Sequence, residues 1–150
     1  MFINNTVITP VMAVRIVIPD TSVLYPIETS FTDKQKDGNH PVYSAKDKIV
    51  DDITVLDVPP IFIKEDSTQS GYYICLDGNF RTSLATLFGI GIEALVFQNV
   101  DDMSQTLRRN FLFAHGIRAQ QEGVQTFDNL AKKIDIYLVD AEMREKYRID

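Results

Sequence analysis

The chain has 150 residues, of which 45% are hydrophobic and 24% are charged, and its formal net charge is −6. This length suits one domain with a hydrophobic core and is short for two. The acidic balance weighs against a protein whose whole surface binds nucleic acid, because phosphate contacts require clustered lysine and arginine.

The first residues, MFINNTVITP, lack the basic start and the cleavage site of a signal peptide. The apolar stretch at 7–18 is too short to span a bilayer and contains Arg15. One cysteine, Cys75, excludes an internal disulfide and is typical of a small buried hydrophobic residue. Because the sequence contains one cysteine and only two histidines, no zinc-type cluster is predicted. We therefore expect a cytoplasmic protein without a membrane partner and without metal-ligating residues of this kind.

The β-branched residues before Ile18 predict a first strand around 14–16. Pro10 cannot donate to a ladder, so this strand begins after it or lies at a sheet edge. Residues 20–41 show no period and contain the polar run TDKQKDGNH. They predict a long loop, either a lid or a solvated insertion.

A capping box at 44–47, SAKD, predicts a short helix that continues to about Ile53. The run IFI at 61–63, which follows two prolines, predicts a strand. The polar residues 64–70 predict a hairpin loop that leads into the next strand, at 72–76. These two strands are therefore expected to be antiparallel neighbours.

The stretch 71–98, GYYICLDGNFRTSLATLFGIGIEALVFQ, predicts a strand, a tight turn, a helix and a second strand. The turn falls at Asp77-Gly78, since glycine tolerates backbone angles that other residues avoid and aspartate can cap a helix. Apolar residues at helical spacing continue to Phe88, and Gly89 ends the helix. Residues 92–97 are again apolar and predict a strand.

After a turn at 99–102, residues 103–121 predict a helix that contains Gly116 and that Gly123 ends. Thr126 is then predicted to cap a last helix with one apolar face. That face comprises Phe127, Leu130, Ile134, Tyr137, Leu138 and Ala141. Basic residues concentrate after position 100 and make DNA a candidate partner. Phe111, Phe113 and Ile117 either belong to the core or provide an apolar surface for a homodimer.

The turn at 77–81 has the features of an anion site. A helix that starts directly after a turn leaves backbone N–H groups free, and together with the helix dipole they favour an anion. Arg81 falls in the first helical turn, where a guanidinium beside free amides matches a phosphate or a carboxylate. In the alternative interpretation, Asp77 only caps the helix and Arg81 only pairs with an acid. Neutral hydrogen-bonding groups are added by Asn79, Thr82 and Ser83.

Several spaced features agree over residues 42–100. They are PPIFI at 59–63, a polar loop, YYICL at 72–76, DGNFR at 77–81, an alanine-containing helix, Gly89-Ile90 and the strand at 92–97. This order resembles the ParB N-terminal and sulfiredoxin-like superfamily, whose members carry a D-G-x-x-R box. Members include CTP-dependent chromosome-partition clamps, ATP-using sulfiredoxins, free-serine kinases and relatives labelled nucleases.

The resemblance implies an α+β fold with a small mixed sheet and helices. Residues 1–100 would form the ParB/sulfiredoxin-like core, with the long loop at 20–41, and 101–150 would be C-terminal helices packed on that core. It also implies that the box binds nucleotide phosphates, so a nucleoside triphosphate with Mg²⁺ is the expected ligand.

Carried over to this sequence, the resemblance implies that Gly78 lets the backbone approach a phosphate and that Arg81 binds it. Asp77 would be the catalytic carboxylate, which orients a nucleophile or holds the metal. Asn79 stands where many members have a histidine, and with Thr82 it completes the expected ligand-binding set.

The sequence also departs from the family pattern. Phe80 replaces the histidine beside the box arginine, and Cys75 lies too early to match the Cys-His pair of sulfiredoxins. Thr82 stands where partition clamps have a second arginine. Three functions are therefore weighed: a nucleotide-binding enzyme or switch in a DNA-related process, a catalytically inactive module that binds protein or DNA, and a nuclease. For the nuclease, the sequence lacks a cluster of metal-binding carboxylates.

Overall fold

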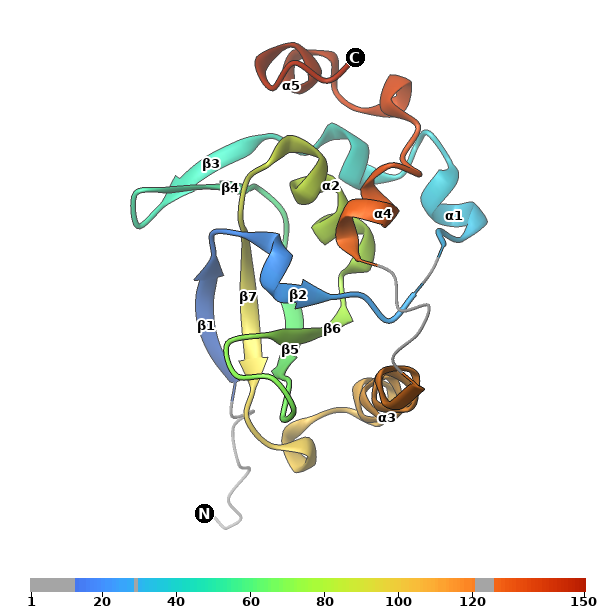
Figure 1. Cartoon of the computed structure of the whole chain (residues 1–150). Helices are drawn as coiled ribbons and strands as arrows, with labels where there is room; N and C mark the ends of the chain where they lie inside the picture. The colour runs from blue at the N-terminus through green and yellow to red at the C-terminus, as the bar shows by residue number, and fades with distance from the viewer. Residues whose placement is uncertain (1–12, 29, 121–125) are drawn as a thin grey trace, which may run out of the picture.

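The computed structural model describes residues 13–28, 30–120 (113–120 by backbone alone) and 126–150. The fold is α+β, with a mixed five-stranded sheet in the order β1-β7-β5-β6-β2 and a separate two-stranded hairpin, β3-β4 (Figure 1). The sheet strands are β1 (Ala13–Ile18), β2 (Leu24–Tyr25), β5 (Ile61–Glu65), β6 (Tyr73–Asp77) and β7 (Ile92–Phe97). The hairpin strands are β3 (Asp47–Val50) and β4 (Ile53–Leu56).

The pairing of the sheet confirms several predicted strands. β5 and β6 are antiparallel neighbours, as the polar loop between them predicts. β1 lies at one edge and pairs antiparallel with β7, while β7 runs parallel to β5. β2 closes the other edge, parallel to β6. The predicted limit of the first strand at Pro10 lies outside the described residues.

Five helices and four short 3-10 turns surround the sheet in the described parts of the chain. The helices are α1 (Asp33–Lys36), α2 (Asn79–Phe88), α3 (Gln105–Gln120), α4 (Phe127–Ala131) and α5 (Ala141–Lys146). The 3-10 turns are η1 (Thr21–Val23), η2 (Pro41–Ser44), η3 (Val100–Asp102) and η4 (Ile136–Leu138). Within the described residues, no helix is long and apolar enough to cross a membrane.

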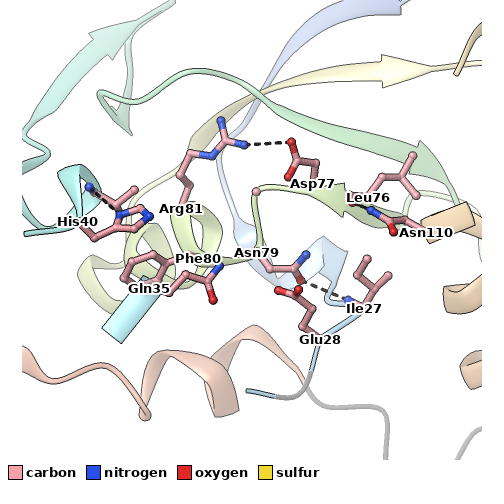
Figure 2. Close-up of a pocket in the computed structure, with 12 residues that line it drawn as sticks. Ile27, Glu28, Gln35, His40, Leu76, Asp77, Asn79, Phe80, Arg81 and Asn110 are labelled. Atoms are coloured by element: carbon pink, nitrogen blue, oxygen red, sulfur yellow. Dashed lines mark hydrogen bonds and ion pairs between the residues drawn. The ribbon is translucent and has the colours of Figure 1, made fainter. Parts of the chain in front are cut away.

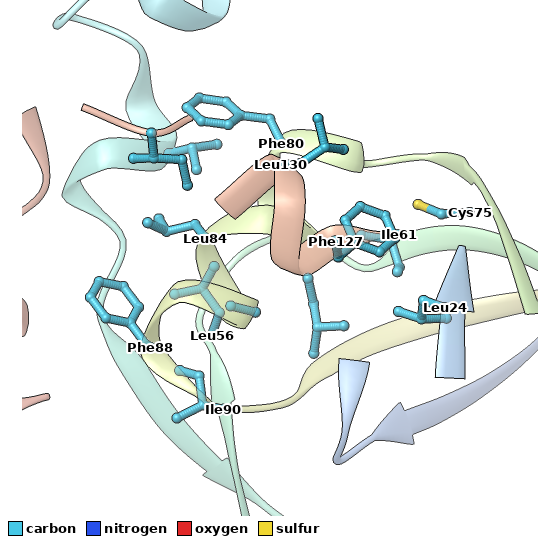
Figure 3. Packing of buried hydrophobic residues seen from close by; sticks show 14 of the residues in the cluster. Leu24, Leu56, Ile61, Cys75, Phe80, Leu84, Phe88, Ile90, Phe127 and Leu130 are labelled. Atoms are coloured by element: carbon cyan, nitrogen blue, oxygen red, sulfur yellow. The ribbon is translucent and has the colours of Figure 1, made fainter. Parts of the chain in front are cut away.

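The main hydrophobic core lies between the sheet, α2 and the C-terminal helices (Figure 3). Ile61 and Cys75 reach it from the sheet, and Leu84 reaches it from α2. Phe127 and Leu130 of α4 belong to the same buried cluster, so the C-terminal segment packs on the core. A smaller cluster holds the start of α3 against β6: Ile27, Ile74, Leu76, Phe97, Met103 and Leu107.

The helix predicted from 45 to 53 is wrong, because these residues form most of the β3-β4 hairpin. Asp51 and Asp52 make its turn with φ of 51° and 65°. A two-residue turn with two positive φ angles matches the twist of a hairpin, and aspartate tolerates this conformation better than most residues. Ile49 is 72% exposed on β3.

The long loop predicted at 20–41 contains more regular structure than expected. β2 adds a short strand to the sheet, and α1 begins at a capping box formed by Thr32 and Gln35. Local polar residues therefore mark a helix start here, although the four-residue helix is too short to show a period.

The single last helix predicted after Thr126 is also wrong, although Thr126 does cap α4. The segment breaks into α4, η4 and α5, and Asp135 and Asp140 cap the two later pieces. Tyr137, which was expected on the apolar face, is 77% exposed. The helix predicted at 103–121 is confirmed as α3 over 105–120, and its predicted stop at Gly123 lies outside the described residues.

Candidate functional site

The turn between β6 and α2 is built around Gly78. This residue is the N-cap of α2 with φ of 104°, and a Cβ added to it would lie 2.4 Å from Ile61 Cγ2. Both the backbone angle and the space therefore require glycine. The expectation that Asp77 caps the helix is wrong, because no side chain caps α2. The first helical bond runs from Thr82 N–H to the Gly78 carbonyl, so the three amides before it have no partner within the helix.

A cavity of about 280 Å³ lies beside this turn and is called the turn cavity below (Figure 2). Residues from three parts of the chain line it: the β6-α2 turn, the segment between β2 and η2, and α3. They are Ile27, Glu28, Gln35, His40, Val42, Leu76, Asp77, Gly78, Asn79, Phe80, Arg81 and Asn110. The structure thus brings four of the five predicted site residues to one cavity: Asp77, Gly78, Asn79 and Arg81.

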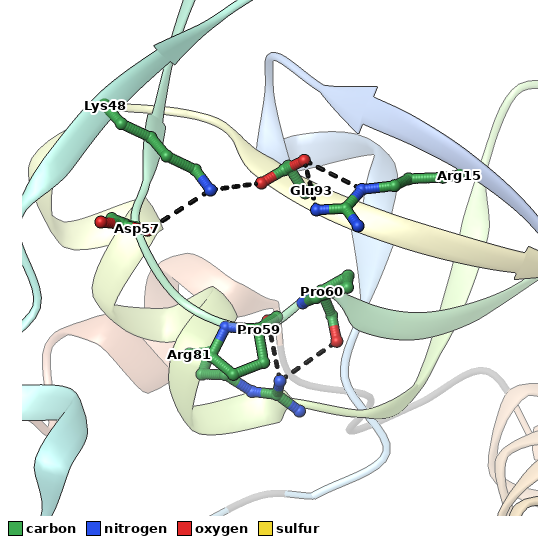
Figure 4. A network of polar contacts seen from close by, with 7 residues as sticks. All are labelled: Arg15, Lys48, Asp57, Pro59, Pro60, Arg81 and Glu93. Atoms are coloured by element: carbon green, nitrogen blue, oxygen red, sulfur yellow. Dashed lines mark hydrogen bonds and ion pairs between the residues drawn. The ribbon is translucent and has the colours of Figure 1, made fainter.

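Arg81 is anchored at one side of the turn cavity (Figure 4). Its Nη1 donates to the carbonyls of Pro59 at 2.8 Å and Pro60 at 3.1 Å, in the segment that leads into β5. Its Nη2 lies 3.7 Å from Asp77 Oδ2, which is an ion pair longer than a direct hydrogen bond. The predicted pairing of Arg81 with Asp77 is therefore present, and two neutral carbonyls hold the guanidinium in place.

Two carboxylates face the turn cavity. The Asp77 side chain is 57% exposed and Glu28 is exposed too. The pKa of Glu28 is raised above its ordinary value, first by desolvation and then by the negative charge of Asp77. Glu28 has no cationic partner among the described residues. Beside one arginine, the cavity therefore carries two acidic groups close enough to influence each other.

The side chain of Asn79 joins two elements at the cavity. Its Oδ1 accepts a hydrogen bond from Ile27 N–H at 3.2 Å and thereby fixes the segment after β2 to the start of α2. The amide nitrogen of the same side chain has no hydrogen-bond partner among the described residues. It is a free donor beside the uncapped helix start.

The structure does not bring Thr82 to the turn cavity. Thr82 is fully buried, and its hydroxyl donates to the Gly78 carbonyl at 2.9 Å. Its Oγ1 also lies 3.9 Å from the Sγ of Cys75. Burial raises the pKa of the Cys75 thiol to about 12, so the reactive thiolate is not formed at neutral pH. Both side chains serve the packing beneath the turn.

Phe80 belongs to an aromatic cluster rather than to the polar site. Its buried ring lies 5.0 Å from the ring of Phe31 and 5.2 Å from that of Tyr43, measured between centroids. The ring of His40 stands edge-on to Phe80 at 5.0 Å. The position where the resemblance expects a histidine thus holds an apolar ring, and a histidine from another segment lies against it.

Four polar lining residues were not predicted as site residues from the sequence: Glu28, Gln35, His40 and Asn110. Asn110 donates from α3 to the Leu76 carbonyl at 2.9 Å and places α3 at the cavity. His40 falls in the loop predicted at 20–41, although His40-Pro41 is a usable signal because proline is favoured at the first position of a helical turn. For Glu28 and Gln35 the sequence carries no local signal.

A second hollow of about 390 Å³ lies next to the turn cavity, and we call it the apolar hollow. Asp77 and Asn110 line both spaces. The remaining walls of the hollow come from β5, β7 and the segment that starts α3: Phe62, Phe97, Asp102, Ser104, Thr106 and Leu107. A polar cavity and a partly aromatic hollow are therefore joined at one carboxylate.

The basic residues of the C-terminal third lie on separate helices. Arg108 and Arg109 are exposed on α3, whereas Arg144 and Lys146 lie on α5. Figure 1 places α3 and α5 at opposite ends of the molecule. Lys146 also pairs with Asp47 at 2.7 Å. These charges are distributed over two distant surfaces.

The described residues contain no group of three or more His, Cys, Asp or Glu side chains that could hold a metal ion on their own. Comparison with protein-family models, with curated proteins and with solved structures finds no match for this chain.

Proposed function

We propose that this chain is a ParB-like domain that binds a nucleotide, with its phosphates and a divalent cation in the turn cavity. The observation that carries the proposal is that an uncapped helix start, an anchored guanidinium and two carboxylates meet at one cavity. Each part supplies a different contact to the ligand.

The start of α2 and Arg81 supply the contacts to phosphate. Free amides at a helix start and the positive end of the helix dipole favour an anion. Arg81 adds a guanidinium whose position is already set by the Pro59 and Pro60 carbonyls, so little side-chain freedom is lost on binding. The free amide nitrogen of Asn79 adds a neutral donor.

Glu28 and Asp77 favour a phosphate that arrives with a cation. Two carboxylates would repel a bare phosphate, since like charges disfavour each other at short range. Mg²⁺ is commonly bound by one or two carboxylates together with substrate phosphates and waters. The oxygen donors fit this cation, which would neutralise the negative charge that Asp77 and Glu28 share.

The apolar hollow favours a nucleotide over inorganic phosphate. Its aromatic wall includes Phe62 and Phe97, and it meets the turn cavity at Asp77 and Asn110. A nucleoside phosphate has an anionic end and a flat aromatic end, which match the two spaces. Aromatic side chains accept a base by stacking on its face.

If the chain is an enzyme, phosphoryl transfer is the reaction that fits these groups. Arg81 and the amides at the start of α2 would stabilise negative charge that develops on the transferred phosphoryl group. Asp77, as the exposed carboxylate, would orient a nucleophile or hold the cation. The bound Mg²⁺ would supply charge neutralisation at the phosphate oxygens.

A second candidate, a catalytically inactive binding module, is favoured by one specific observation. Phe80 stands where the resemblance expects a polar histidine, and its ring is buried against Phe31 and Tyr43. A side chain in this position makes no polar contact with a ligand. The module would keep the fold and the cavity and would act through protein or DNA contacts.

Thermal unfolding with ATP, CTP and GTP, each with and without MgCl₂, tests the proposal. A ligand at about 100 times its dissociation constant stabilises the folded state by roughly 2.7 kcal/mol, which raises the Tm by several degrees. We expect one nucleotide to do so only with Mg²⁺, and Arg81→Gln to abolish the effect. Arg15→Gln, which removes an arginine on β1 far along the chain from the turn, is the matched control and should keep it.

Failure of every nucleotide to raise the Tm would contradict the proposal and favour the inactive module. Nucleotide binding that persists unchanged in Arg81→Gln would locate the ligand elsewhere. A salt-dependent rise in Tm with duplex DNA alone would instead indicate a nucleic-acid partner.

A further inference from the structure

His40 stands at the edge of the turn cavity with its ring held from two sides. Its ring lies edge-on to Phe80 at 5.0 Å and to Tyr43 at 6.4 Å, measured between centroids. Figure 2 shows the ring beside Phe80 and Arg81, among the residues that line the cavity. This histidine therefore has a defined position although it lies in the segment between α1 and η2.

A backbone hydrogen bond fixes which ring nitrogen is available. His40 is the N-cap of η2, and its Nδ1 accepts from Val42 N–H at 3.2 Å. A nitrogen that accepts carries a lone pair, so the hydrogen of the neutral ring is on Nε2. Among the described residues, Nε2 has no hydrogen-bond partner. The ring therefore offers one unused donor.

We propose that His40 contacts the ligand directly, and that its Nε2–H donates a hydrogen bond to a phosphate oxygen in the turn cavity. This inference rests on the proposed function. It gives the site an imidazole from a distant segment, whose ring packs on Phe80. It also gives the segment between β2 and η2 a role, because Glu28 and His40 both reach the cavity from it.

The N-cap alone does not account for a histidine at this position. Serine, threonine, aspartate and asparagine cap helical turns at least as well with a single acceptor. What histidine adds is a second nitrogen on the opposite side of a rigid ring. A donor held in place by packing loses little conformational freedom when it binds.

Two substitutions distinguish the contribution of His40 Nδ1 from that of His40 Nε2. His40→Asn keeps an acceptor near Nδ1 and so keeps the cap, but it has nothing at Nε2. His40→Gln extends an amide N–H₂ toward the place of Nε2 and lacks an acceptor near Nδ1. Because both variants lose the ring, they share the same loss of aromatic packing, and the difference between them reports the role of Nε2.

The measurement is calorimetric titration with the Mg²⁺ complex of whichever of ATP, CTP or GTP raises the wild-type Tm most, at a temperature at which all variants are folded by circular dichroism. We expect His40→Asn to weaken binding about tenfold, as for the loss of one hydrogen bond to a charged group. His40→Gln should stay within about threefold of wild type, since it restores a donor.

Equal affinities of His40→Asn and wild type would overturn the inference, as would equal losses in both variants, which would indicate packing alone. If Arg81→Gln abolishes binding while His40→Asn does not weaken it, only the role of His40 fails. If wild type binds none of the three nucleotides, the proposed function fails and the inference fails with it.

Discussion

Glu93 on β7 and Asp77 on β6 are two acidic centres on strands that flank β5, and their charges are compensated to different extents. The Glu93 side chain is only 6% exposed and has two cations, with Arg15 Nη2 at 2.8 Å and Lys48 Nζ also at 2.8 Å (Figure 4). Asp77 is largely exposed, Arg81 Nη2 lies 3.7 Å from its Oδ2, and a second carboxylate, Glu28, is nearby.

The pKa directions show the same difference. The pKa of Glu93 is lowered, first by the contact with Lys48 and also by that with Arg15, although desolvation opposes both. The pKa of Glu28 is raised by desolvation and by Asp77. The charge of Glu93 is thus compensated by two cations, and these ion pairs link β1, β7 and the β3-β4 hairpin. The centre at Asp77 retains excess negative charge, which is what a site for a cation-bound phosphate requires.

Of the substitutions considered, one in the turn that follows Asp77 should lower the free energy of unfolding most. Gly78→Ala places a Cβ 2.4 Å from Ile61 Cγ2 and keeps a positive φ. We expect a loss of roughly 3 kcal/mol or more in the free energy of unfolding, from strain and overpacking together. Urea unfolding at neutral pH measures it.

Gly89→Ala is the matched control, because Gly89 has φ of 71° and nothing within 4 Å of its missing Cβ. It should cost only the backbone strain, about 1–2 kcal/mol. If Gly78→Ala costs no more than Gly89→Ala, the turn relaxes around the new side chain, and the contact with Ile61 does not hold it.

Glu93→Gln should have the next largest effect. It removes the charge that Arg15 and Lys48 compensate, and hydrogen bonds to charged groups contribute roughly 1.5–3 kcal/mol each. Since both partners are partly exposed and can be solvated again, we expect a total loss of about 1–2 kcal/mol at neutral pH. The unfolding free energy from urea titration is again the readout.

Glu93→Gln should also remove part of the pH dependence of the free energy of unfolding. A carboxylate whose pKa is lowered in the folded state stabilises that state above its ordinary value of 4.5, and the contribution is lost as the pH falls through the lowered pKa. Wild type should therefore lose more stability than Glu93→Gln between neutral pH and about pH 3. A difference between the two proteins that stays constant with pH would contradict this.

Local signals account for the parts of the fold that the sequence predicts. Residues 71–98 form the expected strand, turn, helix and strand, because Gly78, Gly89 and the apolar spacing each act on the few residues around them. The hairpin at 47–56 is missed because a capping box and an Asp-Asp turn compete locally, and only pairing between β3 and β4 decides the outcome.

The candidate site, too, is predictable from the sequence only where its residues lie close together in the chain. Asp77, Gly78 and Arg81 are adjacent in sequence, so their grouping is predictable, whereas Glu28 and His40 reach the cavity only through tertiary packing. One such contact is the hydrogen bond from Ile27 N–H to Asn79, which closes a long span of chain. The burial of Thr82 was also missed. Its hydroxyl donates to the carbonyl of Gly78, one helical turn earlier, and so points inward.

The smallest effect on stability is expected for Asp77→Asn, and this variant separates the two acidic centres most cleanly. The side chain is exposed and its ion pair with Arg81 is long, so the free energy of unfolding should change by less than about 0.5 kcal/mol. The pKa of Glu28 should fall, because one of the two causes that raise it is gone; carboxyl titration by NMR detects this. If Asp77 helps to hold Mg²⁺, as proposed, the rise in Tm with a Mg²⁺ nucleotide should shrink well below that of wild type. If Asp77→Asn instead costs as much stability as Glu93→Gln and leaves the ligand effect intact, Asp77 is a second structural anchor, and the cation must bind elsewhere.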